Sequence, residues 1–160
     1  MKPGQVAVKE VDMPKIMEKD DVILRVVRTC VCGSDLWNYR GDDAKEEGSM
    51  NSGHEVIGIV EEVGEDITTF KKGEFVIAPF IHGCQGHAMS ENFSGGYQAE
   101  YVRYQHANWS LIKIPGQPSD YTEGMIANFL ALADVMPTGY HAARVAHVKT
   151  GDTVAIVGDG

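Results

Sequence analysis

The stretch that decides the fold reads Gly53-His54-Glu55-Val56-Ile57-Gly58-Ile59-Val60-Glu61-Glu62-Val63-Gly64. Its branched apolar residues, bounded by glycines, predict a strand from Glu55 to Val63. The imidazole of His54 therefore sits where the chain enters this strand. A second string, Cys32-Gly33-Ser34-Asp35, directly follows another predicted strand, so the Cys32 thiol sits at a strand end. Each string thus places a side chain that can bind a metal at one end of a strand.

Most of the first two thirds of the chain has the character of short strands. The run Val22-Ile23-Leu24-Arg25-Val26-Val27 is typical of a strand that is buried on much of both faces. Together with the glycine-rich turns, these segments predict a mainly β fold with flanking helices, built as a small barrel or a sandwich. Besides 55–63, the predicted strands are residues 5–11, 21–31, 74–79, 97–104 and 109–115.

Helical character begins only after these strands. Asp120 and Glu123 have the spacing of a capping box, which predicts a helix through residues 125–132. A second helix is predicted to begin near Pro137 and to include residues 140–147. After a turn at 149–152, residues 153–157 indicate a short apolar strand that runs into Gly158-Asp159-Gly160.

The composition excludes several classes of partner. The 160 residues have a net charge of −9, whereas binding to nucleic acid or to anionic membranes needs a basic surface. No apolar run approaches the roughly 20 residues of a membrane span, and no secretory signal is visible. We therefore expect a cytoplasmic protein of one domain or slightly more, with neither nucleic acid nor membrane as a partner.

Cysteine and histidine are the residues most suited to a metal. The odd number of cysteines (Cys30, Cys32 and Cys84) fits a reducing compartment, and we expect no disulfide between Cys30 and Cys32. A Cys32 thiolate and a His54 nitrogen at separate strand mouths suit zinc, which favours sulfur and imidazole. Each residue alone has a plainer explanation, since a strand-end cysteine is more often a small buried apolar side chain.

Taken together, the strings beginning at Cys32 and Gly53 resemble the zinc signature of the medium-chain alcohol dehydrogenases. The resemblance continues through residues 70–76, 96–101 and 134–143 to the glycine turn at the end, and so covers nearly all of the chain. It implies a GroES-like barrel followed by the first strand of a truncated α/β Rossmann domain. The implied boundaries are a GroES-like catalytic domain at 1–124, then connecting helices and the first dinucleotide-domain strand at 125–160.

The same resemblance implies a catalytic zinc site. Its ligands would be Cys32, His54 and Asp134, although Asp134 alone would also suit a helix cap before Pro137. Glu55 would be an alternate, transient ligand or an outer partner of the site. Ser34 would accept the proton of the alcohol, and its plainer explanation is a turn serine that bonds its own backbone.

Other implied roles concern the substrate and the cofactor. Thr138, Gly158 and Gly160 would bind the nicotinamide cofactor, the two glycines as the start of a G-x-G-x-x-G phosphate turn. Trp37 would line the substrate cleft, and simple packing under its loop explains it equally well.

The implied reaction interconverts an alcohol with an aldehyde or ketone by hydride transfer to NAD or NADP. Three protein ligands leave one position of a single catalytic zinc ion open to the substrate oxygen. The full-length protein would be a homo-oligomer acting on small molecules. Two alternatives are a zinc-binding or GroES-like assembly module without turnover and a zinc-free quinone or enone reductase. The set Cys32, His54 and Asp134 argues against both.

The sequence departs from the family pattern in three places. The usual opening strand is missing ahead of Pro3. The lobe that holds a structural zinc with four cysteines is reduced here to His82, Cys84 and His87, so we expect no structural zinc. The chain stops at the second glycine of the phosphate turn, so we expect the 160 residues alone to be inactive.

Overall fold

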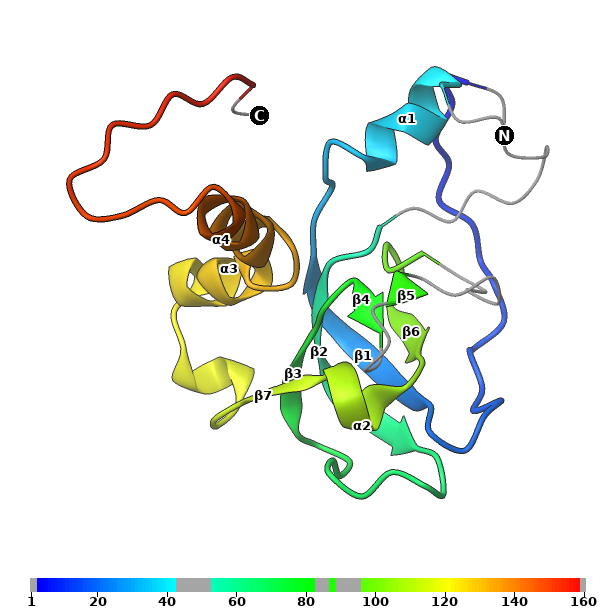
Figure 1. Cartoon of the computed structure of the whole chain (residues 1–160). Coiled ribbons are helices and arrows are strands. Elements are labelled where there is room, and N and C mark those ends of the chain that lie inside the picture. The colour runs from blue at the N-terminus through cyan, green and yellow to red at the C-terminus, as the bar shows by residue number, and fades with distance from the viewer. Residues whose placement is uncertain (1–2, 43–52, 83–86, 89–95, 159–160) are drawn as a thin grey trace.

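A computed structural model describes residues 3–42, 53–82, 87–88 and 96–158 of the chain (Figure 1). In chain order the elements are β1 (Val22–Thr29), α1 (Asp35–Arg40), β2 (Val56–Val63), β3 (Phe75–Ala78), β4 (Ile81–His82), β5 (His87–Ala88), β6 (Tyr101–Tyr104), α2 (Ala107–Ser110), β7 (Ile112–Ile114), a 3-10 turn η1 (Pro118–Asp120), α3 (Glu123–Ala131) and α4 (Val135–Val145). Cys84 and Gly160 lie outside the described residues. None of the helices in the described ranges is long and apolar enough to cross a membrane.

An antiparallel sheet forms the body of the molecule, which confirms the predicted mainly β class. Its five strands lie in the order β6-β1-β2-β3-β7, and β4 pairs with β5 separately. Within the described ranges, β6 and β7 are the two edges and do not pair with each other, so the hydrogen-bonded sheet is open rather than a closed barrel. The predicted strands at 97–104 and 109–115 are shorter than expected, because residues 97–100 form bends ahead of β6 and a single helical turn, α2, takes residues 107–110 ahead of β7.

Both faces of the sheet are buried, as the β-branched strands predict. Strand side chains alternate between faces, so Val56 and Val60 of β2 join one core while Ile57 joins the other. In β3, Val76 and Ala78 belong to the first core and Phe75 and Ile77 to the second. The sheet therefore lies between two apolar layers, and its strand ends have fixed positions.

The β1–β2 pair is bent by two irregularities. Its register shifts between Ile23 and Leu24 and again between Val26 and Arg28. Bulges of this kind bend strands and increase their twist. Gly58 lies opposite the second shift, and a Cβ atom there would come within 2.8 Å of the Arg25 carbonyl oxygen. The glycine within β2 thus permits a close approach of the two backbones.

Helix α3 covers the second face of the sheet (Figure 1). Ile126 and Leu130, one turn apart on the helix, are buried in the second core with Ile57, and α3 contacts both β1 and β2. The predicted capping residue is wrong. Thr122 caps α3 by accepting the Met125 N–H, whereas Asp120 accepts the Gln117 N–H and belongs to the preceding 3-10 turn. The carboxylate of Asp120 is engaged locally, which leaves the cap to the next hydroxyl along the chain.

Helix α4 begins at Val135, two residues earlier than predicted, with Asp134 at the N-cap position. The turn after it is as predicted, since the Lys149 N–H donates to the Asp152 carboxylate.

The predicted strand at 153–157 does not form, and Ile156 and Val157 are 78% and 99% exposed. The predicted strand at 5–11 is also absent, with Val8 fully exposed. Both segments have apolar strand residues, but neither has a hydrogen-bonded neighbour among the described residues, and a strand needs one.

One charged pair is buried near the start of β1. Asp21 is 0% exposed and accepts hydrogen bonds from the Arg103 Nε at 2.5 Å and from the backbone N–H groups of Met17 and Glu18. The Arg103 side chain is itself only 6% exposed. Because every charge in this pair has a partner, burial is compatible with stability here.

Candidate metal centre

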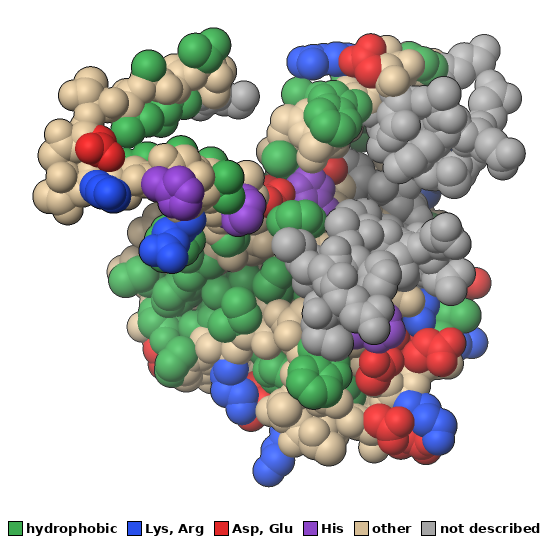
Figure 2. All heavy atoms as spheres, viewed as in Figure 1, with side chains coloured by type: hydrophobic (Ala, Val, Ile, Leu, Met, Phe, Trp, Pro, Cys, Tyr) green, Lys and Arg blue, Asp and Glu red, His purple; other side chains and the backbone are tan. Residues whose placement is uncertain are grey.

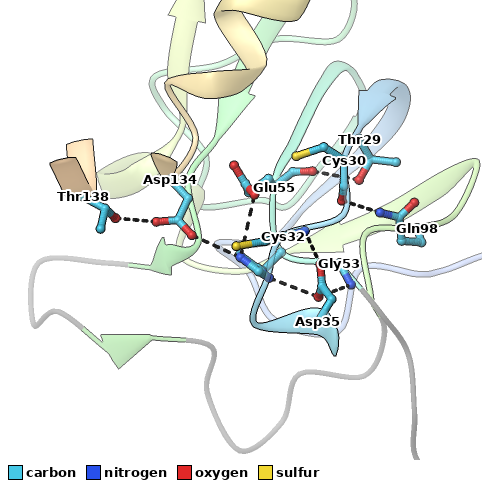
Figure 3. Close-up of polar contacts among 10 residues, drawn as sticks. Thr29, Cys30, Cys32, Asp35, Gly53, Glu55, Gln98, Asp134 and Thr138 are labelled. Atoms are coloured by element: carbon cyan, nitrogen blue, oxygen red, sulfur yellow. Dashed lines mark hydrogen bonds and ion pairs between the residues drawn. The ribbon is translucent and has the colours of Figure 1, made fainter. Parts of the chain in front are cut away.

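The predicted ligands come together where the far end of β1 meets the start of β2. Thr29 at the end of β1 pairs with Val56 at the start of β2, so Cys32 and His54 emerge side by side. Asp134 reaches the same place from the junction of α3 and α4 (Figure 3). Packing of α3 on the second core therefore positions the third predicted ligand. The space-filling view shows a hollow between the α3–α4 side and α1, with histidine and acidic atoms in it (Figure 2).

Four side chains form what we call the donor cluster: Cys32, His54, Glu55 and Asp134. One potential ligand atom from each lies within 4.8 Å of the others. The His54 Nε2 is 3.1 Å from the Asp134 Oδ2 and 3.9 Å from the Glu55 Oε1. All four are at least partly buried, and His54 has a side chain that is 11% exposed.

Asp35, the first residue of α1, links the two strings that contribute to the cluster. Its Oδ2 accepts the Cys32 N–H at 2.8 Å, and its Oδ1 accepts the Gly53 N–H at 3.1 Å. The same Oδ1 is 3.3 Å from the His54 Nδ1 (Figure 3). A carboxylate at Nδ1 favours the tautomer with its proton there, which leaves the Nε2 lone pair facing the donor cluster.

Gly53 is required by the backbone next to His54. Its φ is +96°, a conformation that other residues rarely adopt, and a Cβ atom would come within 2.8 Å of the Gln98 side chain. The backbone here is tied to its neighbour as well, because the Tyr97 N–H donates to the Gly53 carbonyl. The glycine of the Gly53-His54-Glu55 string thus serves the turn that presents the imidazole.

Glu55 is the most unusual member of the cluster. It is 1% exposed, yet neither carboxylate oxygen has a hydrogen-bond partner of ordinary geometry among the described residues. Its backbone is anchored, because the Thr29 hydroxyl donates to the Glu55 carbonyl at 2.8 Å. Burial, and next the Glu55 carboxylate, raise the pKa of the nearby Cys30 thiol to about 12. A buried carboxylate with no stronger donor than a nearby thiol is costly unless a cation neutralises it.

The donor cluster fits a zinc ion. It offers one thiol, one imidazole and two carboxylates, a combination of soft and borderline ligands that suits zinc. Donor atoms around tetrahedral zinc lie about 3.3–3.8 Å apart, given bonds of about 2.0–2.3 Å. The mutual distances within the cluster are close enough for small side-chain adjustments to reach this arrangement.

The other predicted site residues lie around the cluster or away from it. Ser34 is half-buried in the turn between Cys32 and α1, and Trp37 is 58% exposed on α1. Thr138 is exposed on the first turn of α4, where its hydroxyl donates to the Asp134 Oδ1 at 2.6 Å. Gly158 is exposed with φ +80°, and the structure does not bring it to the donor cluster.

One feature of the site was not predicted from the sequence, namely the contacts by which Asp35 joins the Cys32 and His54 strings. Asp35 belongs to the quoted Cys32-Gly33-Ser34-Asp35 string, and its spacing of three residues from Cys32 is typical of a carboxylate that accepts a backbone N–H in a tight turn. Cys30 was expected only as a free thiol. Cys30 and Cys32 are both unpaired, as predicted, but only Cys32 offers a ligand atom to the cluster.

Residues 18–116 match the family described as the alcohol dehydrogenase GroES-like domain. The chain is 37% identical to an uncharacterized zinc-type alcohol dehydrogenase-like protein of Bacillus subtilis, over 97% of this chain and 47% of the relative. It is 35% identical to a glutathione-independent formaldehyde dehydrogenase of Pseudomonas aeruginosa, over 99% of this chain and 46% of that protein. The chain thus spans about half the length of these curated relatives.

The structural comparison agrees with the sequence comparison. The alcohol dehydrogenase TADH from Thermus sp. ATN1 superposes with a TM-score of 0.77 at 29% identity, covering 94% of this chain and 47% of that one. The family match covers more than half of the 160 residues and includes Cys32, His54 and Glu55. The chain belongs to the zinc-dependent medium-chain alcohol dehydrogenase family and has its GroES-like fold.

Proposed function

We propose that this chain is the zinc-binding, substrate-binding part of an oxidoreductase that interconverts an alcohol with an aldehyde or ketone, using NAD or NADP. Family membership supports the oxidoreductase class. The single observation that supports the site is the donor cluster, in which three separate chain segments bring a thiol, an imidazole and two carboxylates within 4.8 Å. Cys32, His54 and Asp134 would hold the ion, with Glu55 as an alternate ligand or outer partner.

Each of these side chains has a definable task. The Cys32 thiolate and the Asp134 carboxylate would compensate the charge of a divalent cation, and His54 would present a neutral Nε2 because Asp35 faces its Nδ1. A zinc ion held there would act as a Lewis acid on the substrate oxygen and lower the pKa of an alcohol. Ser34, beside Cys32 in the chain, would accept the alcohol proton and pass it outward.

The remaining roles are proposals drawn from family resemblance. Trp37 would wall the substrate cleft, and Thr138, Gly158 and Gly160 would contact the nicotinamide cofactor. The division at 124/125, between a catalytic domain and the start of a dinucleotide-binding domain, is also proposed from this resemblance. So is a homo-oligomeric state of the full-length protein. The cofactor would accept the hydride, so its ring must be held against the carbinol carbon for turnover.

A non-catalytic assembly module is the second candidate, and the donor cluster argues against it. An assembly surface needs neither a buried carboxylate without donors nor an imidazole whose tautomer is set by Asp35. A zinc-free reductase is disfavoured for the same reason, because burial of the Glu55 carboxylate with so few donors lowers stability unless a cation lies beside it.

The first test is the metal content of the chain after loading with zinc and gel filtration. We expect one zinc ion per chain in the wild type and loss of bound zinc in Cys32→Ala and Asp134→Asn. Cys30→Ala is the matched control, since it removes a thiol two residues away that lies outside the donor cluster. Zinc retention in Cys32→Ala, or equal loss in Cys30→Ala, would contradict the proposed site.

The second test concerns the reaction itself. A longer protein that joins this chain to a nicotinamide-binding domain should oxidise alcohols and reduce carbonyls, followed by the absorbance of the reduced cofactor. Asp134→Asn and Cys32→Ala should abolish turnover in that protein, because each deletes an anionic ligand. A zinc-loaded longer protein that turns over neither alcohols nor carbonyls would favour the assembly module.

A further inference from the structure

The side chain of Asp134 does not do what an aspartate at its position usually does. Asp134 occupies the N-cap of α4, where a carboxylate normally accepts an N–H from the first turn of its own helix. No such cap bond forms here, and the residue has an irregular backbone conformation with φ −149° and ψ −58°. The Asp134 Oδ2 instead lies 3.1 Å from the His54 Nε2 in the donor cluster.

The other carboxylate oxygen is occupied by a residue of the same helix. The Thr138 hydroxyl donates to the Asp134 Oδ1 at 2.6 Å (Figure 3). The helical bond from the Thr138 N–H to the Asp134 carbonyl, at 2.9 Å, fixes the spacing of the two residues. Threonine on a helix often donates its hydroxyl to the carbonyl four residues back. Here it donates to the side chain of that residue instead.

Resting on the proposed function, we propose that Thr138 is a positioning residue for Asp134, which it holds so that Oδ2 alone serves as the metal ligand. The two oxygens of the carboxylate have different partners, a hydroxyl on one and the cluster on the other. The branched threonine side chain has few rotamers and keeps its hydroxyl in place. With Oδ1 engaged, the carboxylate can neither rotate back to cap α4 nor offer both oxygens equally to a cation.

This role differs from the cofactor contact that resemblance implies for Thr138, and the two can be separated by experiment. A group that only touches the cofactor does not affect zinc affinity in the absence of nicotinamide. A group that orients a ligating carboxylate does, and loss of such partners typically weakens metal binding 10–100-fold. The Thr138 side chain is exposed, whereas the Asp134 side chain is 16% exposed. Water competes for the hydroxyl, so we expect the lower end of that range.

The test compares the full chain as wild type, Thr138→Val and Thr138→Ser, without nicotinamide. Valine keeps the branched shape and removes the donor, and serine restores the donor. Zinc affinity is measured by competition with a chromophoric chelator, and the visible spectrum of the Co²⁺ form reports the geometry of the site. Thr69→Val is the matched control, because the exposed Thr69 hydroxyl likewise donates to a side-chain oxygen, that of Asn108, in the loop beyond the end of β2 opposite His54.

We expect Thr138→Val to bind zinc about tenfold more weakly and to change the Co²⁺ spectrum, while Thr138→Ser and Thr69→Val retain the wild-type affinity and spectrum. Wild-type affinity and spectrum in Thr138→Val would overturn the inference. A Thr138→Ser variant as weak as Thr138→Val, or an equal loss in Thr69→Val, would overturn it as well. A wild type that binds no zinc would overturn the proposed function, and this inference with it.

Discussion

Asp21 and Glu55 are both buried carboxylates that directly precede a β-branched strand, and their surroundings are opposite. Asp21 is met by Arg103 and by two backbone N–H groups. Glu55, at the other end of the same antiparallel strand pair, receives no hydrogen bond of ordinary geometry from the described residues. Both are almost fully buried, at 0% and 1% exposed.

The difference separates a charge buried for stability from a charge buried for a ligand. A buried carboxylate with a full set of hydrogen-bond donors is part of the stable fold. Removal of its partner leaves a buried charge without compensation and so lowers the free energy of unfolding. One without donors but next to a thiol, an imidazole and a second carboxylate keeps its oxygens available to a cation. Sequence alone does not distinguish them, since Asp21-Val22-Ile23 and Glu55-Val56-Ile57 have the same pattern.

The largest expected effect comes from breaking the satisfied pair. Asp21→Ala leaves the Arg103 guanidinium buried without its partner, so the free energy of unfolding should fall by about 3–5 kcal/mol, measured by urea denaturation. Asp20→Ala is the neighbouring control, because Asp20 pairs with His106 at an exposed site and should contribute at most about 1 kcal/mol. Equal effects of the two substitutions would show that burial of the pair is unimportant.

A substitution of Glu55, the buried carboxylate that lacks ordinary hydrogen bonds, should instead raise the free energy of unfolding. Glu55→Gln replaces a buried charge with a neutral amide, which costs less to desolvate, so the metal-free chain should gain about 1 kcal/mol of stability at neutral pH. Urea denaturation in the presence of a chelator provides the measurement. A clear loss of stability in the metal-free variant would mean that Glu55 is a structural group like Asp21.

Substitution of Asp35, the carboxylate that contacts His54, should have an intermediate effect, seen in the zinc affinity. Asp35→Asn keeps one acceptor oxygen but loses the charge that faces the His54 Nδ1, so zinc affinity should fall about tenfold. Chelator competition measures the affinity, and circular dichroism checks that the variant is folded. Unchanged affinity in a folded variant would remove Asp35 from the account of the site.

The smallest effect on stability is expected at the surface ion pair of Lys113 and Glu74. The hydrogen bond from Lys113 to Glu74, ahead of backbone and Coulombic contributions, holds the pKa of Glu74 below its usual value. Because the folded pKa is depressed, this contribution to stability is present above the unfolded pKa and is lost as pH falls through the folded pKa. Glu74→Gln should therefore cost at most about 1 kcal/mol at neutral pH and nothing in strong acid. A penalty that persists in acid would point to packing rather than charge.

Strand positions were predictable where the pattern itself contains the information. The alternation of Val56, Ile57 and Val60 between two buried faces is visible in the sequence, and β1, β2 and β3 lie where it predicts. The segments at 5–11 and 153–157 have similar apolar residues but no strand beside them among the described residues. Local pattern cannot supply a pairing partner, so these predictions were wrong.

The residues of the candidate site could be predicted from the sequence, but the contacts among them could not. Cys32, His54 and Asp134 were named from strings that lie far apart in the chain, and the structure brings them together. The 1% exposure of Glu55 depends on the packing of the folded chain, and the contact of Asp35 with His54 depends on how a turn meets the start of a strand. Neither property is encoded in the spacing of residues.

X-ray absorption at the zinc edge can show whether Cys32 binds the metal, because it counts the sulfur neighbours of the bound ion in the zinc-loaded chain. The wild type and Cys30→Ala should each show one sulfur at about 2.3 Å, with nitrogen and oxygen donors at about 2.0–2.2 Å. Cys32→Ala should lose its bound zinc, and any residual zinc ion in that variant should have no sulfur neighbour. A zinc ion surrounded only by lighter atoms in the wild type, or a sulfur neighbour that survives in Cys32→Ala, would contradict the assignment of the donor cluster as the metal centre.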